Sequence, residues 1–163
     1  MVGRLVTIGV YESTLEEFLD ALRDAGVGVL LDVRQRRGVR GPQYAWANSQ
    51  RLQRAVADAG IEYHHLKELA PTTVMRQAQY AVDAAKGEGK RNRSHISEEY
   101  ERLYLEQILG PADLDPIAAL AGESLPALFC VEADPEACHR SLIAERLAAR
   151  YGVQEIHLRP GRT

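Results

Sequence analysis

Residues 125–142 read LPALFCVEADPEACHRSL and pass from an apolar run through a polar turn into a helical pattern. The apolar run at 127–131 is typical of a strand buried at the centre of a sheet. Asp134 then fits a helix N-cap and Pro135 fits the first helical position, so a helix is expected over 134–151. A buried strand followed by a loop and a helix is the repeating unit of α/β folds.

The same unit recurs along the whole chain. Apolar or β-rich runs predict strands at residues 4–8, 27–33, 61–66, 127–131 and 153–158. Helical periodicity and capping residues predict the helices between them, at residues 13–26, 49–59, 72–85, 97–109, 116–121 and 134–151. We therefore expect a three-layer α/β sandwich with a mainly parallel five-stranded sheet in the Rossmann-like order 3-2-1-4-5. Its ligand-binding switch point should lie between the first and fourth strands.

The composition is that of an ordinary globular protein. Of 163 residues, 45% are hydrophobic and 26% are charged, and the net charge is -3. These values predict one domain over residues 1–163 without a global basic excess, so any binding to nucleic acid must be local. No apolar run reaches the length of a membrane span, and the N-terminal MVGRLVTIGV lacks the apolar core of a signal peptide. We expect a cytoplasmic protein without a membrane partner, and the sequence does not fix its oligomeric state.

Two carboxylates lie at the ends of strands that are predicted to be buried. Asp32 lies near the end of the run VGVLLDV, and Glu132 follows the run at 127–131. A charge at the end of a strand buried on both faces is costly without a partner, and ligands bind at the carboxyl ends of parallel strands. Both residues are therefore candidate catalytic residues. The alternative for Asp32 is an ion pair with a neighbouring arginine.

Several chemically reactive side chains accompany Glu132. Cys138, His139 and Arg140 fall near the predicted helix start, where backbone N–H groups and the helix dipole favour an anion. Cys138 is either a nucleophile or a small packing residue, and His139 is a candidate acid–base. Cys130 is either a functional thiol or an inert core residue. The spacing Cys130-x7-Cys138 differs from the tight spacings of metal sites, so we predict no metal and no cofactor.

The strongest local charge is the basic loop at 34–48, RQRRGVRGPQYAWAN. The loop contains Arg34, Arg36, Arg37 and Arg40, and its candidate ligand-binding residues are Arg34, Arg37, Arg40, Tyr44 and Trp46. Arginine forks bind phosphate and aromatic rings stack on bases, so the loop favours a phosphate-bearing ligand such as a nucleotide, DNA or RNA. A second basic loop at 86–95 is predicted to be mobile. Tyr11 and His65 complete the predicted rim of the cleft.

Four segments resemble the domain of unknown function 488 family, in its order and with similar spacings. They are TIGVYESTLEEFLDAL at 7–22, LLDVR at 30–34, GIEYHHLKEL at 60–69 and ALFCVEADPEACHRSLIAERL at 127–147. In the family, the last segment typically contains Cys-Ala-Glu, Asp-Pro and Cys-His-Arg, which are matched by Cys130, Glu132, Asp134, Pro135, Cys138, His139 and Arg140. One departure is Ala70-Pro71-Thr72, where the family usually has a glycine pair. The resemblance implies an α/β fold and a shared site but supplies no reaction.

The Asp-Val-Arg at 32–34 is also similar to a strand end of rhodanese-like sulfurtransferases. In that family an arginine follows the nucleophilic cysteine within its loop. Glu136 stands at the corresponding position after Cys130, and Ala144 stands there after Cys138. Sulfur transfer and tyrosine-phosphatase chemistry are therefore disfavoured.

These features together predict an enzyme that acts on a phosphate-bearing nucleotide or nucleic-acid substrate. Its most concrete form is hydrolysis of a nucleoside bond, as in base removal during DNA repair. Here Arg34 and Arg140 would hold the anion, while acidic groups and His139 would manage proton transfer. The alternatives are a non-catalytic nucleotide or nucleic-acid binding module, and a thiol- or metal-dependent enzyme that uses Cys130 and Cys138.

Overall fold

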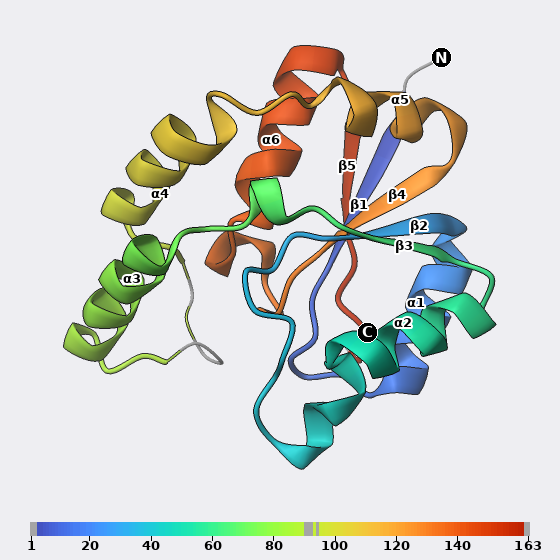
Figure 1. Cartoon of the computed structure of the whole chain (residues 1–163), viewed down its shortest axis with the longest axis horizontal. Helices are drawn as coiled ribbons and strands as arrows, with labels where there is room; N and C mark the ends of the chain where they lie inside the picture. The colour runs from blue at the N-terminus through green and yellow to red at the C-terminus, as the bar shows by residue number, and fades with distance from the viewer. Residues whose placement is uncertain (1–2, 90–92, 94, 162–163) are drawn as a thin grey trace.

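A computed structural model describes residues 3–89, 93 and 95–161 of the chain (Figure 1). Its five strands form one sheet in which every pairing is parallel. The strands are β1 (Arg4–Ile8), β2 (Val27–Asp32), β3 (Glu62–His65), β4 (Leu125–Phe129) and β5 (Gln154–His157). The predicted parallel five-stranded sheet is therefore confirmed.

The strand order is β3-β2-β4-β1-β5, which differs from the predicted 3-2-1-4-5. β4 lies between β2 and β1, and Ala127 pairs with Leu30 on one side and with Val6 on the other. All five residues of β4 are buried, as expected for a central strand, whereas the edge strands β3 and β5 have no fully buried residue. Both orders allow right-handed crossovers, so local sequence patterns cannot distinguish them.

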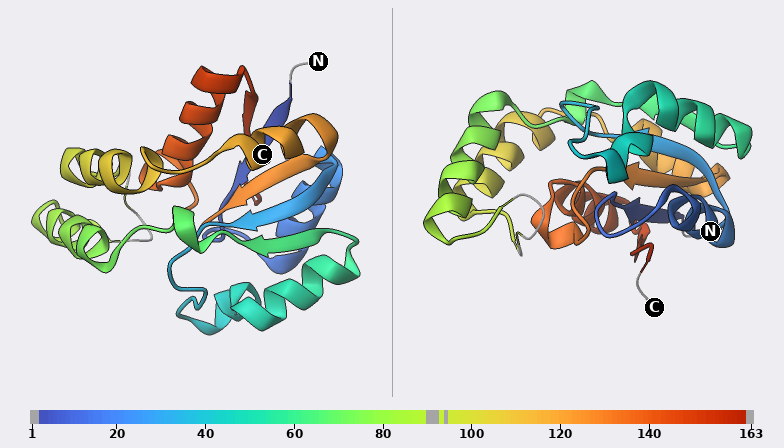
Figure 2. Two further views of the ribbon diagram at one scale, coloured as in Figure 1. Left: turned by 45° about the horizontal axis from the view of Figure 1, so that its top comes forward. Right: turned by 90° about the horizontal axis from the view of Figure 1, so that it is seen from below.

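Helices cover both faces of the sheet and give the predicted three layers (Figure 2). Helices α1 (Leu15–Ala25) and α2 (Ser49–Asp58) pack on one face, against β2 and β3. Helices α5 (Asp115–Glu123) and α6 (Arg140–Tyr151) pack on the other face, against β4, β1 and β5. The confirmed fold class is a three-layer α/β sandwich.

Two further helices lie beyond the carboxyl ends of the strands (Figure 1). Helix α3 (Thr73–Ala85) packs against α4 (Glu98–Tyr104), which continues into a π-helical turn, Leu105–Leu109. Short 3-10 helices are Pro42–Ala47, Lys67–Leu69 and Pro135–Ala137. The predicted mobile loop at 86–95 lies partly outside the described residues, which exclude 90–92 and 94.

Local capping explains where α1 begins, but α6 begins later than predicted. Thr14 accepts from the backbone N–H of Glu17 and the Glu17 carboxylate accepts from the Thr14 backbone, so the capping box begins one residue after Ser13. Asp134 introduces the 3-10 turn Pro135–Ala137 instead of an α-helix. Cys138 is then extended, with φ -140° and ψ 149°, and this interrupts the helical path before α6 starts.

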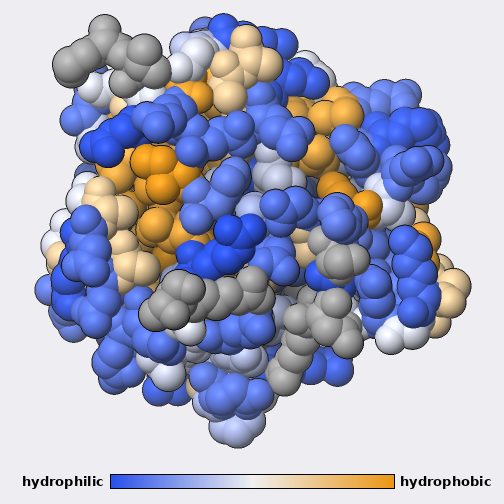
Figure 3. All heavy atoms as spheres, turned by 180° about the vertical axis from the view of Figure 1, so that it is seen from behind, coloured by the Kyte–Doolittle hydropathy of each residue, from blue (hydrophilic) through white to orange (hydrophobic). Residues whose placement is uncertain are grey.

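An apolar cluster fills most of the interior. Phe18, Phe129 and Leu30 belong to the set of fully buried core side chains. The face seen in Figure 3 is mainly hydrophilic, with separate apolar patches between the charged side chains. Within the described ranges, no helix combines the length and apolar character that a membrane span requires.

Candidate functional site

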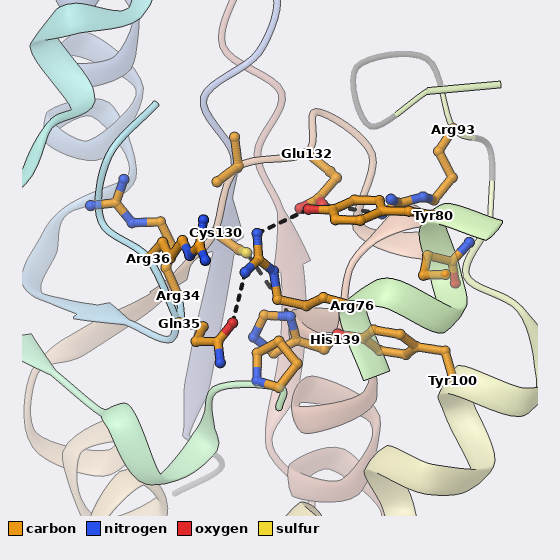
Figure 4. Close-up of a pocket in the computed structure, with 13 residues that line it drawn as sticks. Arg34, Gln35, Arg36, Arg76, Tyr80, Arg93, Tyr100, Cys130, Glu132 and His139 are labelled. Carbon is orange, nitrogen blue, oxygen red and sulfur yellow. Dashed lines mark hydrogen bonds and ion pairs between the residues drawn. The ribbon is translucent and has the colours of Figure 1, made fainter. Parts of the chain in front are cut away.

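A pocket opens at the carboxyl ends of β2 and β4 and faces helices α3 and α4 (Figure 4). It holds about 430 Å³ of empty space, including the open mouth. Residues that follow β2 and β4 form one side, and residues of α3 and α4 form the other. The lining residues are Arg34, Gln35, Arg36, Pro71, Arg76, Gln79, Tyr80, Arg93, Tyr100, Cys130, Val131, Glu132 and His139.

The topology explains the position of this pocket. β2 and β4 are neighbours, and the chain leaves β2 toward α2 on one face and leaves β4 toward α6 on the other. Diverging connections of this kind leave a crevice at the strand ends, where ligands of open α/β sheets bind. The predicted switch point lay between the first and fourth strands. The described residues that line the pocket instead include those that follow β2 and β4, and none of them comes directly after β1.

Asp32 and Arg34 form a buried ion pair at the end of β2. Arg34 donates from Nε to Asp32 Oδ1 at 2.9 Å and from Nη2 to Oδ2 at 2.8 Å, and its backbone N–H also donates to Oδ1. Tyr63 donates its hydroxyl proton to Oδ2. Asp32 is fully buried and Arg34 is 1% exposed. The structure therefore matches the ion-pair alternative for Asp32, whose two oxygens are already surrounded by donors.

Tyr63 supports this pair and was not predicted as a site residue. Burial raises the pKa of its hydroxyl, the hydrogen bond from Arg37 lowers it, and the hydrogen bond to Asp32 raises it; the net pKa is about 12. The hydroxyl consequently stays protonated at neutral pH and keeps donating to Asp32.

Arg93 links α3 to the loop after β4. It donates from Nη2 to Asp83 Oδ2 at 2.7 Å, from Nη1 to Glu132 Oε1 at 3.2 Å, and from Nη1 to the Ala137 carbonyl. Gln79 also donates to the Asp83 carboxylate. The charged side chains of Arg93, Asp83 and Glu132 are all buried. Burial lowers the pKa of Arg93, but the hydrogen bond to Asp83 and the charges of Glu132 and Asp83 raise it to a net higher value. Arg93 therefore remains a cation whose charge is balanced inside the protein.

Two further arginines line the pocket. Arg76 donates from Nη1 to Gln35 Oε1 at 2.7 Å and from Nη2 to the Tyr80 hydroxyl at 2.9 Å (Figure 4). Arg36 is exposed. Over residues 3–89, 93 and 95–161, neither Arg36 nor Arg76 forms an ion pair with a carboxylate. Their positive charges are therefore available to an anionic ligand.

Cys130, Cys138 and His139 come together beside the pocket. His139 donates from Nε2 to the Val33 carbonyl at 2.8 Å, so Nδ1 carries the lone pair of the neutral ring. Nδ1 lies 3.6 Å from Cys138 Sγ and 4.0 Å from Cys130 Sγ. All three side chains are buried, and both cysteines are free thiols. Cys130 and His139 line the pocket, whereas Cys138 is outside the lining.

Burial and the neighbouring groups oppose ionisation of the Cys130 thiol. Burial raises the pKa of Cys130, and the hydrogen bond to Cys138 and the charges of Cys138 and Glu132 raise it further. Burial lowers the pKa of His139, whereas the charge that Cys130 carries when ionised and the hydrogen bonds to Cys130 and Val33 raise it, with a net upward direction. In the free protein Cys130 is therefore a protonated thiol at neutral pH.

Arg140 serves the loop after β4 and lies outside the pocket lining. It donates to the Glu132 carbonyl at 2.6 Å and to the Ala133 carbonyl at 3.2 Å, and its side chain is fully buried. Arg34 is meanwhile bound to Asp32. The predicted convergence of Arg34 and Arg140 on one anion is thus absent from this arrangement, because each guanidinium already has internal acceptors.

The aromatic residues of the basic loop at 34–48 pack inward. Trp46 is 8% exposed, and its ring lies 5.0 Å from that of Phe18. Tyr44 lies 5.2 Å from the Tyr11 ring and accepts from the backbone N–H of Glu12. A nucleic-acid base could stack on Trp46 only if the core opened, so the predicted stacking role of Trp46 does not fit its position.

Two of the remaining predicted residues, Arg37 and His65, lie beside the Asp32–Arg34 pair. Arg37 donates to the Tyr63 hydroxyl at 3.4 Å, and His65 donates from Nε2 to the Arg34 carbonyl at 2.9 Å. Arg40 is exposed on the loop. None of Arg37, Arg40 and His65 belongs to the described pocket lining, so a direct role in ligand binding stays a prediction.

Sequence reasoning missed the contribution of α3. Arg76, Gln79, Tyr80 and Asp83 lie three and four positions apart, which places them along one side of that helix. This polar stripe was a usable signal, but a polar helical face usually meets solvent. Here Gln79 and Asp83 are instead buried, and Arg76, Gln79 and Tyr80 line the pocket.

A family model described as Domain of unknown function DUF488 matches residues 14–147. The chain belongs to this family. The matched range contains every described residue that lines the pocket, from Arg34 to His139. Comparison with curated proteins gave no match, and comparison with solved structures gave none. Membership in the DUF488 family confirms the resemblance seen in the sequence, and the family description names no reaction.

Proposed function

We propose that this pocket is the active site of an enzyme whose substrate carries a phosphate group, as nucleotides and nucleic acids do. The observation that supports this proposal is the presence of Arg36 and Arg76 in the lining without carboxylate partners among the described residues. Arginine binds phosphate through paired N–H donors, and a partly enclosed site strengthens that interaction relative to open water.

The charges around the pocket support an anionic ligand. Asp32 neutralises Arg34, and Arg93 lies between two carboxylates, Asp83 and Glu132. With Arg36 and Arg76 added, the described residues of these ion pairs and of the lining comprise four arginines and three carboxylates, an excess of one positive charge. The excess is carried by the two arginines without carboxylate partners, so a phosphate would be held next to them, close to the Glu132 carboxylate.

Glu132 is the carboxylate best placed for chemistry. It belongs to the described lining, whereas Asp32 lies outside that lining and is held by Arg34 and Tyr63. In our proposal Glu132 accepts a proton from the attacking water during hydrolysis of a nucleoside bond. Asp32 then acts as a positioning residue that fixes Arg34, in place of the catalytic role expected from the sequence.

Arg76→Gln tests the binding half of the proposal. Titration calorimetry with nucleoside mono-, di- and triphosphates and with a single-stranded oligonucleotide containing an abasic site would first identify a ligand. Loss of a charge-assisted hydrogen bond should weaken that ligand by about tenfold or more. Arg54→Gln on the exposed surface of α2 is the matched control and should leave affinity unchanged. Equal affinities for the two variants would contradict the proposed site.

Glu132→Gln tests the catalytic half. Release of base or sugar phosphate from the bound substrate should stop, while affinity should stay within about threefold of wild type because the side chain keeps its size and an acceptor oxygen. Glu136→Gln, which changes an exposed carboxylate outside the lining, should retain full turnover. Retained turnover in Glu132→Gln would remove Glu132 from the mechanism.

A second candidate function is non-catalytic binding of the same ligand class. It is favoured by the engagement of both predicted acids in buried ion pairs, Asp32 with Arg34 and Glu132 with Arg93. Assays of the wild-type protein distinguish the two candidate functions. Tight binding without any product across the ligand panel supports the binding module, and product formation supports the enzyme.

A further inference from the structure

We propose that Cys130, Cys138 and His139 form a binding site for one divalent transition-metal ion of the Zn²⁺ type, with its fourth position facing the pocket. The two Sγ atoms and a ring nitrogen of His139 all lie within 4.8 Å of one another. Two thiolates and an imidazole are a ligand set that zinc accepts in sites that keep one position open. The sequence favoured no metal and left metal-dependent chemistry at Cys130 and Cys138 only as an alternative, because the Cys130-x7-Cys138 spacing is wider than those of common zinc motifs.

The interatomic distances fit a tetrahedral ion. With Zn–S near 2.3 Å and Zn–N near 2.0–2.1 Å, tetrahedral angles place S and N about 3.6 Å apart and two sulfurs about 3.8 Å apart. His139 Nδ1 lies 3.6 Å from Cys138 Sγ and 4.0 Å from Cys130 Sγ. Each of the two Nδ1–Sγ distances needs to change by less than an ångström to match a tetrahedral ion, and side-chain rotations can supply such a change.

The orientation of His139 is already fixed for a ligand at Nδ1. Its Nε2 donates to the Val33 carbonyl at 2.8 Å, so the neutral ring presents the Nδ1 lone pair to the two sulfurs. A carbonyl acceptor on the distal nitrogen is the usual support of a metal-binding histidine, because it sets the tautomer and the ring angle. The Tyr104 ring, 5.3 Å from the His139 ring, packs on the same side chain.

Topology brings the ligands together despite their spacing in sequence. Cys130 directly follows β4, and the 3-10 turn Pro135–Ala137 folds the chain back so that Cys138 and His139 return to this strand end. Cys130 and His139 line the pocket and Cys138 does not, so an ion bound by all three would present its remaining position toward the pocket.

The charge balance suits a buried site. Each thiol releases its proton to solvent when it binds the ion, so two thiolates cancel the 2+ charge and no uncompensated charge remains in the interior. Binding therefore releases protons and requires no change in oxidation state. This inference stands on the ligand geometry and does not depend on a phosphate-bearing substrate, because metal binding can be measured without one.

The test uses the whole chain, stripped of metal with a chelator, reduced, and titrated with Co²⁺ and then Zn²⁺. We expect one Co²⁺ per chain, a near-ultraviolet thiolate-to-metal charge-transfer band, and the strong visible bands of tetrahedral Co²⁺, all removed by Zn²⁺. Zn²⁺ should also raise the Tm and protect both cysteines from iodoacetamide. The absence of the charge-transfer band together with an unchanged Tm would overturn the site.

Variants assign the ligands. Cys138→Ala and His139→Gln should each weaken Zn²⁺ binding by at least about tenfold, since each removes a direct ligand. His64→Gln, an exposed histidine on β3, is the matched control and should bind as wild type does. If either site variant fails to fold, iodoacetamide mapping of wild type decides: Zn²⁺ must protect Cys130 and Cys138 together, and protection of neither contradicts the proposal.

Discussion

Nη2 of Arg34 lies 2.8 Å from Oδ2 of Asp32, and both side chains are almost completely shielded from solvent. The pair joins residues two apart at the end of β2, where an extended chain directs alternate side chains to the same side. Arg34 also donates to the Ala47 carbonyl at 2.9 Å and stacks over the Phe129 ring. One guanidinium therefore connects β2, β4 and the loop that follows β2, and it fixes one wall of the pocket.

Asp32→Asn should destabilise the protein by about 3–5 kcal/mol, because it leaves the Arg34 charge buried without its partner. The free energy of unfolding from urea titration measures the loss. Asp20→Asn is the matched control: it breaks an exposed pair with Arg23 and should cost less than about 1 kcal/mol.

Combining Asp32→Asn with Arg34→Gln should cost clearly less than the sum of the two single changes, because the double variant contains no uncompensated charge. Additive losses would show that the two side chains contribute to stability independently, contrary to the contacts between them.

The raised pKa of Tyr63 predicts that the folded protein loses stability at alkaline pH. Its hydroxyl has a pKa of about 12 in the folded protein against 10.0 ordinarily, so above pH 10 the unfolded chain releases a proton that the folded chain keeps. The unfolded state then binds fewer protons, and the stabilisation contributed by Tyr63, fully present below pH 10, falls as pH rises toward 12.

Tyr63→Phe isolates this contribution. The variant should be less stable than wild type at neutral pH, because the donor to Asp32 is lost, and the difference should shrink between pH 10 and pH 12. Urea titrations of both proteins at matched pH values measure it. Tyr100 and Tyr104, whose pKa values burial also raises, are present in both proteins and cancel. A constant difference across this range would contradict the assignment.

Local sequence signals were sufficient for most of the elements but not for their arrangement. The helix predicted at 49–59 is α2, Ser49–Asp58, because capping and periodicity are local properties. The position of β4 between β2 and β1 depends on pairing between strands far apart in sequence, and no local pattern encodes it. The helix expected from Asp134 begins only at Arg140, because the Cys138 backbone N–H closes a 3-10 turn on Pro135 and the chain then extends.

The candidate site was predicted where strand ends supply it. Arg34 and Glu132 were predicted because parallel strands present their carboxyl ends at one edge, and His139 was predicted from its place near the expected helix start; all three line the pocket. The polar stripe that contains Arg76 and Gln79 was visible in the sequence, but a polar helical face usually meets water, so the stripe alone did not place α3 at this edge. For Trp46 the difference runs the other way. The sequence predicted that it would face a ligand, but it packs against Phe18, since an aromatic residue in a basic loop can equally complete the core.

Arg93→Gln should destabilise the protein by about 3–5 kcal/mol, because it leaves Asp83 and Glu132 buried without their shared cation. Urea titration measures this loss. Arg102→Gln is the matched control, since Arg102 pairs with two carboxylates on an exposed helical surface, and it should cost less than about 1 kcal/mol. Similar losses in the two variants would contradict a central structural role for Arg93.

Gly9→Ala should destabilise the protein by about 1–3 kcal/mol and displace Glu132, because a methyl group at this position would overlap the Glu132 backbone carbonyl. The two loops are already fixed together by the hydrogen bond from the Val10 N–H to the Val131 carbonyl at 2.9 Å, so neither can move aside cheaply. Gly122→Ala is the matched control: it lies in α5 with open space around it and should stabilise by about 0.5–1 kcal/mol. Urea titration compares the two variants, and a shift in the affinity of any pocket ligand in Gly9→Ala alone reports the movement of Glu132. Unchanged stability in Gly9→Ala would mean that the ends of β1 and β4 are not packed as closely as this structure places them.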